Sequence, residues 1–564
     1  MKKTLAVLLA VLLTVGMCPV FAFAAGAKAY KVDYTKPPVI LIDGINAVKL
    51  IRDIGTKEET TAFPFESDDV VDIIKSHANE LWDMLDGDYS AENENSVLDA
   101  VIGMLDDIAM NDDGTSKYDI TADWFYPGET RPAYIGEEEE QSGFDISGEI
   151  NGKLNEIKNW FRSLFQDEPE ELTEEEIKIK MLENRSTYKF QYDWRLDPFV
   201  IVEQLHEYIE FMKEFTGFDT VTLVGFSEGA AMLNTYLTVY GFDGLESVIW
   251  LCGAQNGVEL VGQLFTGRIS VDAQALTEYV RDNGGTKTSD ELLADVLQGF
   301  KAIGITGGVL EYANNIIDAL LKDGGIRTVI RETFAKMPAI WALIGDDYYE
   351  EAKAYVFNEP GDAETFATLL ETIDRYHYEV QTHCAEIMAN AKAATGKIGV
   401  VAKYGLRVTP LIENSDIQSD GVIDVKSTSC GATAAPYGKT LGDGYTQAVA
   451  DGHNHLSSDG MIDASTALYP DNTWFFKNLQ HSNLPDCVYD LLYFIANADH
   501  QVTVFEDAKF PQYQVYSPID GVSSPLKGDG GQNAIRRAIL RIKMYFKDLL
   551  NRIRDFFGIK DKDD

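Results

Sequence analysis

Ser227 stands at the centre of the pentapeptide Gly225-Phe226-Ser227-Glu228-Gly229, between a run of β-prone residues and a run of small residues that suit a helix. This order predicts a strand, a sharp turn and a helix, with the serine at the apex of the turn. The flanking glycines would let strand and helix approach closely, and the strained turn would hold the hydroxyl clear of the backbone. A serine presented in this way can attack a carbonyl carbon. The alternative is an ordinary strand-to-helix turn with a solvated serine.

Two backbone N–H groups are candidates for stabilising the oxyanion that such an attack creates. The first is that of Glu228, directly after the serine, whose side chain we expect at a helix N-terminus near the developing charge. The second is that of Ile45, because a buried-strand run at 39–42 ends there in a glycine turn. The alternative for Ile45 is an ordinary strand end.

A serine nucleophile also needs a base, and an acid that orients the base. Among the late histidines, His481 falls between the last expected strand and the last expected helix, and it is the candidate base. His453 and His455 lie in a loop of Gly, Asp and Ser, where they could ligate a metal together with Asp451 or Asp459. We expect a polar surface loop there instead.

The candidate acid is Asp420, because it follows an expected strand near Leu411. The segment around it, Ser419 to Asp424, recurs as Ser458 to Asp463. Asp424, Asp459 and Asp463 therefore remain rivals for the same role.

The elements that must position these groups alternate between strand and helix. Strands are expected at 39–42, 188–194, 221–224, 245–252 and 473–476, and at either 398–402 or 408–412, with helices at 200–215, after Ser227 and at 485–496. This alternation predicts a mostly parallel sheet covered by helices on both faces. With the chain order serine, acid, histidine, it indicates an α/β-hydrolase fold with large helical cap insertions.

The expected domain spans 25–516 and carries insertions at about 49–184 and 257–397. The first is acidic and mostly helical or looped, and the second is helical and could form a cap. Residues 517–532 hold prolines, glycines and serines and indicate a linker. A helix over 533–564 has an apolar stripe flanked by Arg and Lys, typical of an interfacial helix on anionic lipid. The alternatives are packing on the protein itself or a coiled coil.

A basic start, an apolar stretch over 4–20 and the small-x-small site Ala22-Phe23-Ala24 predict a signal peptide over 1–24. We therefore expect a secreted or cell-envelope protein. The formal net charge of −43 argues against nucleic acid as a partner. The cysteines after the signal peptide are far apart, without metal-ligand spacing; disulfides are possible but nothing demands them.

Four separated motifs resemble the lecithin:cholesterol acyltransferase-like family, which includes lysosomal phospholipase A and phospholipid:diacylglycerol acyltransferase. They are Pro38 to Gly44, Tyr192-Asp193-Trp194-Arg195-Leu196, Ser419 to Ile423, and Leu479 to Asn483. The resemblance covers the sheet, about half of the chain, and neither insertion nor the tail. It implies serine acyl chemistry, with Ser227 as nucleophile, Asp420 as acid and His481 as base.

The chain departs from the family pattern near the serine. Phe226 and Glu228 stand where the family usually has His and Leu or Met, and Asp43 replaces a proline. Serine acyl chemistry carries over as an expectation, but the acyl donor and acceptor do not.

We therefore expect an exported serine ester hydrolase, such as a lipase, esterase or phospholipase, or an O-acyltransferase acting on acyl esters, with lipids favoured. Its chemistry needs no metal and no organic cofactor. One alternative is a catalytically weak envelope binding protein on a hydrolase fold, motivated by Glu228 and the acidic insertions. The other is a serine peptidase or amidase.

Overall fold

The computed structural model describes the chain from residue 35 to residue 528, with gaps. The described residues are 35–45, 47–65, 76, 99, 102–103, 105–127, 129, 131–132, 188–270, 275, 279, 324–518 and 521–528. The expected signal peptide (1–24) and C-terminal helix (533–564) lie outside them, as do most of the insertion at 49–184 and the centre of the insertion at 257–397.

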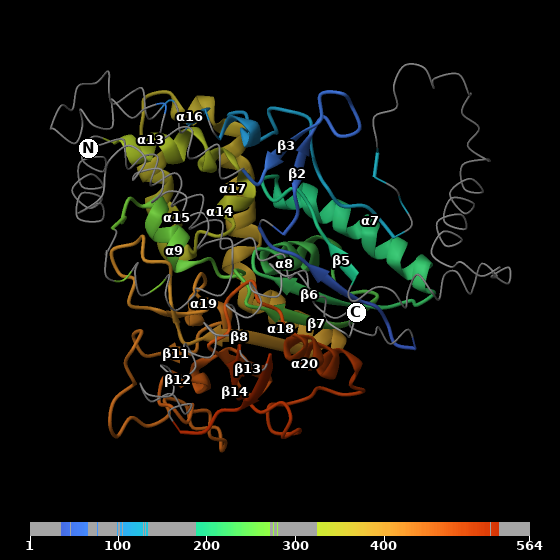
Figure 1. The fold of residues 1–564 in the computed structure, drawn as a ribbon, viewed down its shortest axis with the longest axis vertical. Helices are drawn as coiled ribbons and strands as arrows, with labels where there is room; N and C mark the ends of the chain where they lie inside the picture. The colour runs from blue at the N-terminus through green and yellow to red at the C-terminus, as the bar shows by residue number, and fades with distance from the viewer. Residues whose placement is uncertain are drawn as a thin grey trace, which may run out of the picture.

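An eight-stranded sheet forms the centre of the described chain (Figure 1). Its strands, in spatial order, are β15 (Val522–Pro525), β14 (Tyr513–Ser517), β13 (Thr473–Lys477), β8 (Ile398–Tyr404), β7 (Leu245–Leu251), β6 (Val221–Phe226), β1 (Val39–Ile42) and β5 (Tyr188–Phe190). Every neighbouring pair is parallel except β14 and β15. The expected α/β-hydrolase fold with a mostly parallel sheet is confirmed.

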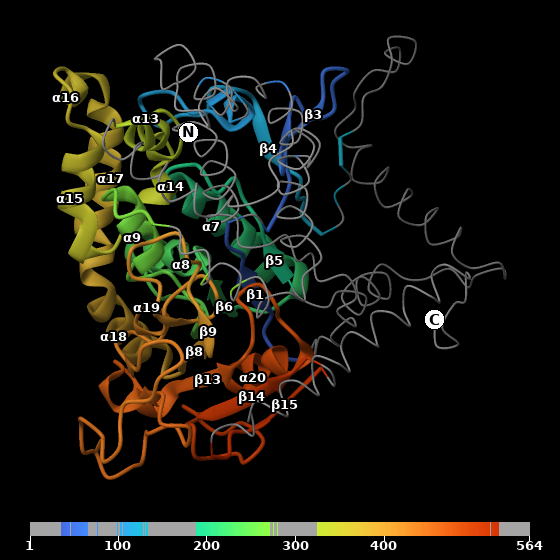
Figure 2. The same cartoon turned by 60° about the vertical axis from the view of Figure 1, so that its left-hand side comes forward.

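Helices cover both faces of this sheet because central strands such as β1 and β6 are mostly apolar and fully buried, and successive side chains point to opposite faces. In β1, Ile40 and Ile42 belong to a core shared with α7 (Pro198–Thr216), α8 (Gly229–Tyr240) and α18 (Cys384–Thr395). Val39 and Leu41 belong to a second core shared with α20 (Asp486–Asn497). Figure 2 shows α7 and α8 on one side of the sheet and α20 on the other.

The parallel arrangement brings the candidate site residues to one edge of the sheet. Ile45, Ser227 and His481 follow the carboxyl ends of β1, β6 and β13, which point the same way. Asp420 follows β10 (Gln418–Ser419), which pairs with β9 (Leu406–Arg407) just beyond the end of β8. In open parallel sheets, ligands bind at this carboxyl edge.

The first insertion differs from the expectation of helix and loop. It contributes a three-stranded antiparallel sheet of β3 (Thr60–Phe63), β2 (Leu50–Arg52) and β4 (Ile120–Ala122), and a short helix η1 (Asp106–Ile108). Strands of three or four residues are too short to show a period-two pattern, so no local pattern signals them.

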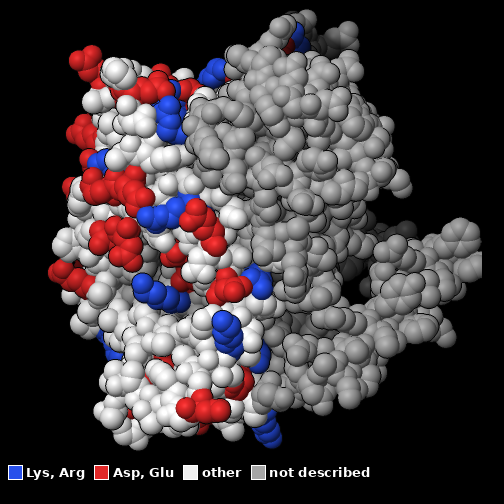
Figure 3. Space-filling model, turned by 90° about the vertical axis from the view of Figure 1, so that its left-hand side faces the viewer, with Lys and Arg blue, Asp and Glu red and all other residues white. Residues whose placement is uncertain are grey.

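The described part of the second insertion is helical, as expected. Its helices are α9 (Glu259–Phe265), α13 (Gly325–Glu332), η2 (Phe334–Lys336), α14 (Pro338–Trp341), α15 (Asp346–Val356), α16 (Asp362–Thr365), α17 (Ala367–Glu379), η3 (Gln381–His383) and α18. Figure 3 shows this side of the molecule, where Asp and Glu side chains gather over the upper part with Lys and Arg between them.

In the C-terminal half, the structure decides one open alternative and corrects one expectation. The sheet resumes at β8, so the first of the two alternative strands is right and 408–412 is not a strand of the sheet. The segment 517–532, expected as a linker, contains β15, which pairs antiparallel with β14 at the edge of the sheet. An edge strand tolerates the prolines that favoured a linker, because its outer N–H groups need no partner.

Two further expectations concern export and membranes. Cys252, Cys384, Cys430 and Cys487 are all free thiols, so none of the disulfides left open by the sequence is formed. Within the ranges that the structure describes, no helix has both the length and the hydropathy to cross a bilayer.

Candidate active site

Ser227 occupies the sharp turn that its surroundings predict. It lies between the last residue of β6 and the first residue of α8, and its φ of 58° is in the left-handed region that non-glycine residues avoid. The turn is this tight because helix and strands nearly touch. A Cβ on Gly225 would lie 2.7 Å from Cα of Ala230, and one on Gly229 would lie 2.1 Å from the carbonyl oxygen of Ile42. Both flanking positions therefore require glycine.

Ser227, His481 and Asp420 form one hydrogen-bonded chain. The Oγ of Ser227 lies 2.9 Å from Nε2 of His481, and Nδ1 of His481 lies 2.6 Å from Oδ2 of Asp420. All three come from different segments of the chain, and the histidine and aspartate side chains are almost fully buried. The structure thus brings together the three residues that the sequence nominated.

The surroundings of Asp420 fix the direction of these hydrogen bonds. Its Oδ1 accepts the backbone N–H groups of Val422 and Ile423 at 3.0 and 2.7 Å. Its Oδ2 is then left to accept from Nδ1–H of His481, because a carboxylate can only accept. That tautomer leaves Nε2 of His481 unprotonated, facing the hydroxyl of Ser227, which is the arrangement a general base needs.

The three rival aspartates are engaged elsewhere. Asp424 caps the short helix α19 (Val425–Thr428) and accepts the backbone N–H of Ser427 at 2.8 Å. Asp459 pairs with the ammonium group of Lys477 at 2.9 Å. Asp463 accepts from Tyr445 and from local backbone N–H groups. Of the four candidates, only Asp420 hydrogen-bonds to His481.

The two candidate oxyanion donors lie beside the serine. A Cβ on Gly44 would stand 2.9 Å from Oγ of Ser227, which places the Asp43–Ile45 turn directly against it. Ile45 lines the same pocket as Ser227, and Glu228 is the next residue in the chain. No acceptor among the described residues takes a hydrogen bond from the backbone N–H of Ile45 or Glu228. Within the part of the chain that the structure describes, both donors are therefore available to a ligand.

The side chain of Glu228 does not lie where we expected it from the sequence. It makes no capping hydrogen bond at the start of α8 and is fully buried. Its Oε2 accepts from the hydroxyl of Tyr192 at 3.2 Å, and its Oε1 has no partner in the described chain. Burial raises the pKa of Glu228 well above 4.5, which favours the neutral carboxyl group. We expected the carboxylate of Glu228 near the developing negative charge. In the structure this side chain is instead buried behind Ser227, against Tyr192.

Lys403 is a residue of this site that sequence reasoning missed. It is fully buried on β8, and its Nζ donates to the carbonyl oxygens of Gln480, His481 and Asn483 at 3.0, 2.6 and 3.0 Å. Burial lowers the pKa of Lys403. One ammonium group therefore holds three carbonyls of the loop that carries the candidate base. No short-range pattern signals this role, because the partners lie 77 or more residues away in sequence.

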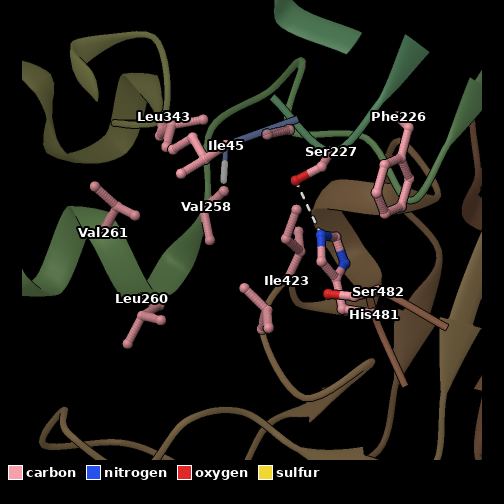
Figure 4. Close-up of a pocket in the computed structure, with 12 residues that line it drawn as sticks. Ile45, Phe226, Ser227, Val258, Leu260, Val261, Leu343, Ile423, His481 and Ser482 are labelled. Atoms are coloured by element: carbon pink, nitrogen blue, oxygen red, sulfur yellow. Dashed lines mark hydrogen bonds between the residues drawn. The ribbon is translucent and has the colours of Figure 1, made fainter. Parts of the chain in front are cut away.

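An apolar pocket opens in front of the serine and the histidine (Figure 4). Its apolar lining consists of Ile45, Phe226, Ala254, Val258, Leu260, Val261, Leu343, Val422 and Ile423. Val258 directly precedes α9, Leu260 and Val261 belong to its first turn, and Leu343 follows α14, so the second insertion forms one wall. Phe226 stacks on the His481 ring with centroids 5.0 Å apart.

The Tyr192-to-Arg195 motif connects the serine turn to the first insertion. Arg195 is fully buried and pairs with Asp193 at 2.5 Å, and it also donates to the carbonyl oxygen of Ile108 in η1 at 3.0 Å. Tyr192, at the start of the motif, donates to Glu228. The motif therefore has a positioning role here, since its side chains do not line the pocket.

The His453 and His455 loop lies away from this site. His453 is exposed, but His455 is completely buried, so the expectation of a polar surface loop is wrong for His455. The reason is a distant partner, Gln512, which hydrogen-bonds to the ring from 57 residues further along the chain.

No family model and no curated protein matches this chain. Among solved structures, a chain of the crystal structure of the Tle4–Tli4 complex is similar, with 11% sequence identity and a TM-score of 0.31, covering 77% of this chain and 88% of that one. At that score the likeness carries no weight of its own. The fold assignment therefore rests on the order and direction of the strands.

The buried acid predicts a pH-dependent difference between the protein and its Glu228→Gln variant. The folded-state pKa of Glu228 lies above the value of about 4.3 expected in the unfolded chain, so wild-type stability is complete below that pH and is lost as pH rises toward the folded-state pKa. The glutamine amide of the variant does not ionise. We expect the variant to gain about 1.4 kcal/mol per pH unit relative to wild type across this window.

The measurement is urea unfolding of both proteins at several pH values between about 5 and 7, chosen to lie above the unfolded pKa of about 4.3. Glu371→Gln, on the exposed side of α17, controls for the loss of one charge. Parallel stability curves for wild type and Glu228→Gln would show that the carboxyl group is not held neutral.

Lys403→Met should lower kcat while changing KM little, because it releases the loop that holds His481 but leaves the pocket lining in place. A misplaced base costs on the order of 100-fold in rate. Steady-state kinetics on a chromogenic ester, normalised to folded protein, measures this. Lys477→Met is a matched control, since Lys477 is a buried lysine on the adjacent strand that contacts Asp459 and not the loop. Equal kcat values for the two variants would contradict the positioning role.

Proposed function

We propose that this protein is a serine ester hydrolase or O-acyltransferase. The observation that carries the proposal is the unbroken hydrogen-bonded chain from Ser227 through His481 to Asp420, at the mouth of an apolar pocket. The strained backbone at Ser227 supports it, because such strain persists in proteins mainly at functional sites.

In the proposed reaction, Oγ of Ser227 attacks the carbonyl carbon of an acyl ester, and Nε2 of His481 takes the hydroxyl proton. The negative charge that develops on the carbonyl oxygen is stabilised by the backbone N–H groups of Glu228 and Ile45. His481 then protonates the leaving alcohol, which leaves an acyl-enzyme. Asp420 holds the imidazole in the required tautomer and stabilises its positive charge. Deacylation repeats these steps with a second nucleophile.

The substrate that the pocket suits is an ester with an apolar acyl group. Aliphatic side chains such as Val258, Leu343 and Ile423 line the space beside the serine, and the described lining residues include no acidic, Lys or Arg side chain that could fix a polar chain. We propose lipids as the substrate class on this basis and on the resemblance to the lecithin:cholesterol acyltransferase-like family. With water as second nucleophile the protein is a lipase, esterase or phospholipase; with an alcohol it is an acyltransferase.

The burial of Glu228 weakens the case for a catalytically weak binding protein. That alternative was motivated by a carboxylate beside the nucleophile, and the structure instead has Glu228 buried against Tyr192. A peptidase or amidase would use the same three residues, so the substrate assay must include an amide.

The cellular location and a membrane partner are proposals from sequence alone, because residues 1–24 and 533–564 lie outside the described chain. We propose export, and attachment to anionic lipid through the basic C-terminal helix, to which each basic residue adds about 1 kcal/mol. We expect the full chain to co-sediment with anionic vesicles at low salt and a version ending at Gly528 not to. Equal sedimentation of the two proteins would rule out the helix as the anchor.

The triad assignment predicts that Ser227→Ala, His481→Ala and Asp420→Asn each lower kcat by at least about 10³-fold. Combining two of these changes should add little further loss, because the residues act as one unit. The assay is a series of p-nitrophenyl esters of increasing acyl length, a phospholipid and a p-nitroanilide.

Asp459→Asn is the matched control, since it removes the carboxylate of a rival aspartate that lies away from His481. Near-wild-type activity of Asp420→Asn together with an inactive Asp459→Asn would overturn the choice of acid. Faster turnover of the anilide than of any ester would favour the amidase alternative.

A further inference from the structure

A second cluster of chemically reactive side chains lies away from the candidate active site. Asp451, His453, His455 and Asp471 each present one ligand atom, and these atoms lie within 4.8 Å of one another. Asp471 belongs to the short helix η5 (Pro470–Asn472), which directly precedes β13. His481 follows the other end of β13, so the cluster and the catalytic residues lie at opposite ends of this strand.

A buried glutamine fixes the tautomer of His455. The amide nitrogen of Gln512 donates to the carbonyl oxygens of Pro470 and Thr473 at 2.8 and 3.2 Å, so its other atom must be the oxygen. That oxygen lies 2.9 Å from Nδ1 of His455 and can only accept, which requires a proton on Nδ1. Nε2 of His455 is therefore the ring nitrogen that remains for another partner.

This remaining nitrogen faces carboxylate oxygens. Nε2 of His455 lies 2.9 Å from Oδ2 of Asp451 and 3.4 Å from Oδ1 of Asp471. The same oxygen of Asp471 lies 3.1 Å from Nδ1 of His453. One imidazole nitrogen and two carboxylates thus surround one point, where a cation, either a metal ion or a proton on Nε2, balances the negative charge. Since His455 is completely buried, water cannot screen this contact from its own side.

The rest of the cluster is held in place by neighbouring groups. Oδ1 of Asp451 accepts the backbone N–H of His453 at 2.9 Å, which leaves Oδ2 directed at His455. The backbone of His455 is held by Gln447 and Tyr513 at 2.7 and 2.6 Å. The exposed ring of Phe505 packs against both imidazoles, with centroids 4.5 and 5.6 Å away.

We propose that these four side chains bind a divalent transition-metal ion of the zinc class. Two imidazoles and two carboxylates are ligands that Zn²⁺ accepts, whereas Ca²⁺ and Mg²⁺ prefer oxygen alone. The two carboxylates balance the charge of the ion. Tetrahedral zinc with bonds of about 2.0–2.1 Å needs ligand atoms about 3.3 Å apart. The pairs now 2.9 and 3.1 Å apart would separate slightly, and the wider pairs, all within 4.8 Å, would draw together.

Metal-bound histidines usually donate their other ring N–H to a nearby acceptor, which orients the imidazole. For His455 this acceptor is the side-chain oxygen of Gln512. All four positions are supplied by the protein, so the ion is structural and takes no part in the ester chemistry proposed above. It joins the loop at 451–455 to the segment that enters β13. We expect it to stabilise the folded chain by binding the native state alone.

The test uses the full-length protein, stripped of metal with a chelator and dialysed at high salt, which screens non-specific attraction of cations to a chain of charge −43. Zn²⁺ titration followed by calorimetry should show one equivalent bound with micromolar or tighter affinity. At about 100-fold excess over Kd, the Tm should rise by about 2 °C or more. Co²⁺ in place of Zn²⁺ should give the visible absorption of a four-coordinate site.

The double variant Asp451→Asn/His453→Gln should lose at least about tenfold in affinity and the Co²⁺ spectrum. Both residues are exposed, so the variant should fold. His500→Gln is the matched control, because His500 is an exposed histidine that also lies between two carboxylates, those of Asp499 and Glu506. Its binding should equal that of wild type. Multiple weak sites in wild type, or unchanged binding by the double variant, would overturn the proposal.

Discussion

The buried hydrogen bond between Asp420 and His481 is the interaction on which the candidate site depends. It selects the imidazole tautomer that can take a proton from Ser227, and it does so because Asp420 has its other oxygen occupied by two backbone N–H groups. The loop that carries His481 is held from the opposite side by the ammonium group of Lys403. Each of these partners comes from a different strand or loop at the carboxyl edge of the sheet, so the geometry exists only when the whole sheet is formed.

Behind the nucleophile, a buried polar network connects the serine turn to the first insertion. Glu228 contacts Tyr192, and Arg195 of the same motif reaches the backbone of η1. Buried polar groups of this kind are costly unless they are satisfied, and Oε1 of Glu228 has no partner among the described residues. A neutral carboxyl group lowers that cost, which agrees with the raised pKa of Glu228. The side chain of Glu228 is therefore accommodated by the core and does not line the pocket in front of Ser227.

Local patterns predicted the parts of this molecule that depend on local order. The strand–serine–helix turn, the strands of the sheet centre and the positions of Asp420 and His481 follow from short motifs and from their order in the chain, and the structure brings these residues together. The catalytic role of the three residues stays a prediction. What sequence reasoning missed depends on distant partners or on very short elements: the direction of the Glu228 side chain, the contacts of Lys403, the burial of His455 by Gln512, and strands such as β2 and β15. None of these features produces a periodic pattern in the sequence.

The most direct test of the central claim is whether Ser227 is an activated nucleophile. The full-length protein would be treated with a fluorophosphonate, and the modified residue identified by peptide mass spectrometry. The account predicts a single adduct on Ser227, formed much more slowly in His481→Ala, and prevented by an ester substrate present in excess. A folded protein that remains unlabelled, or one labelled at another residue with Ser227 intact, would contradict it.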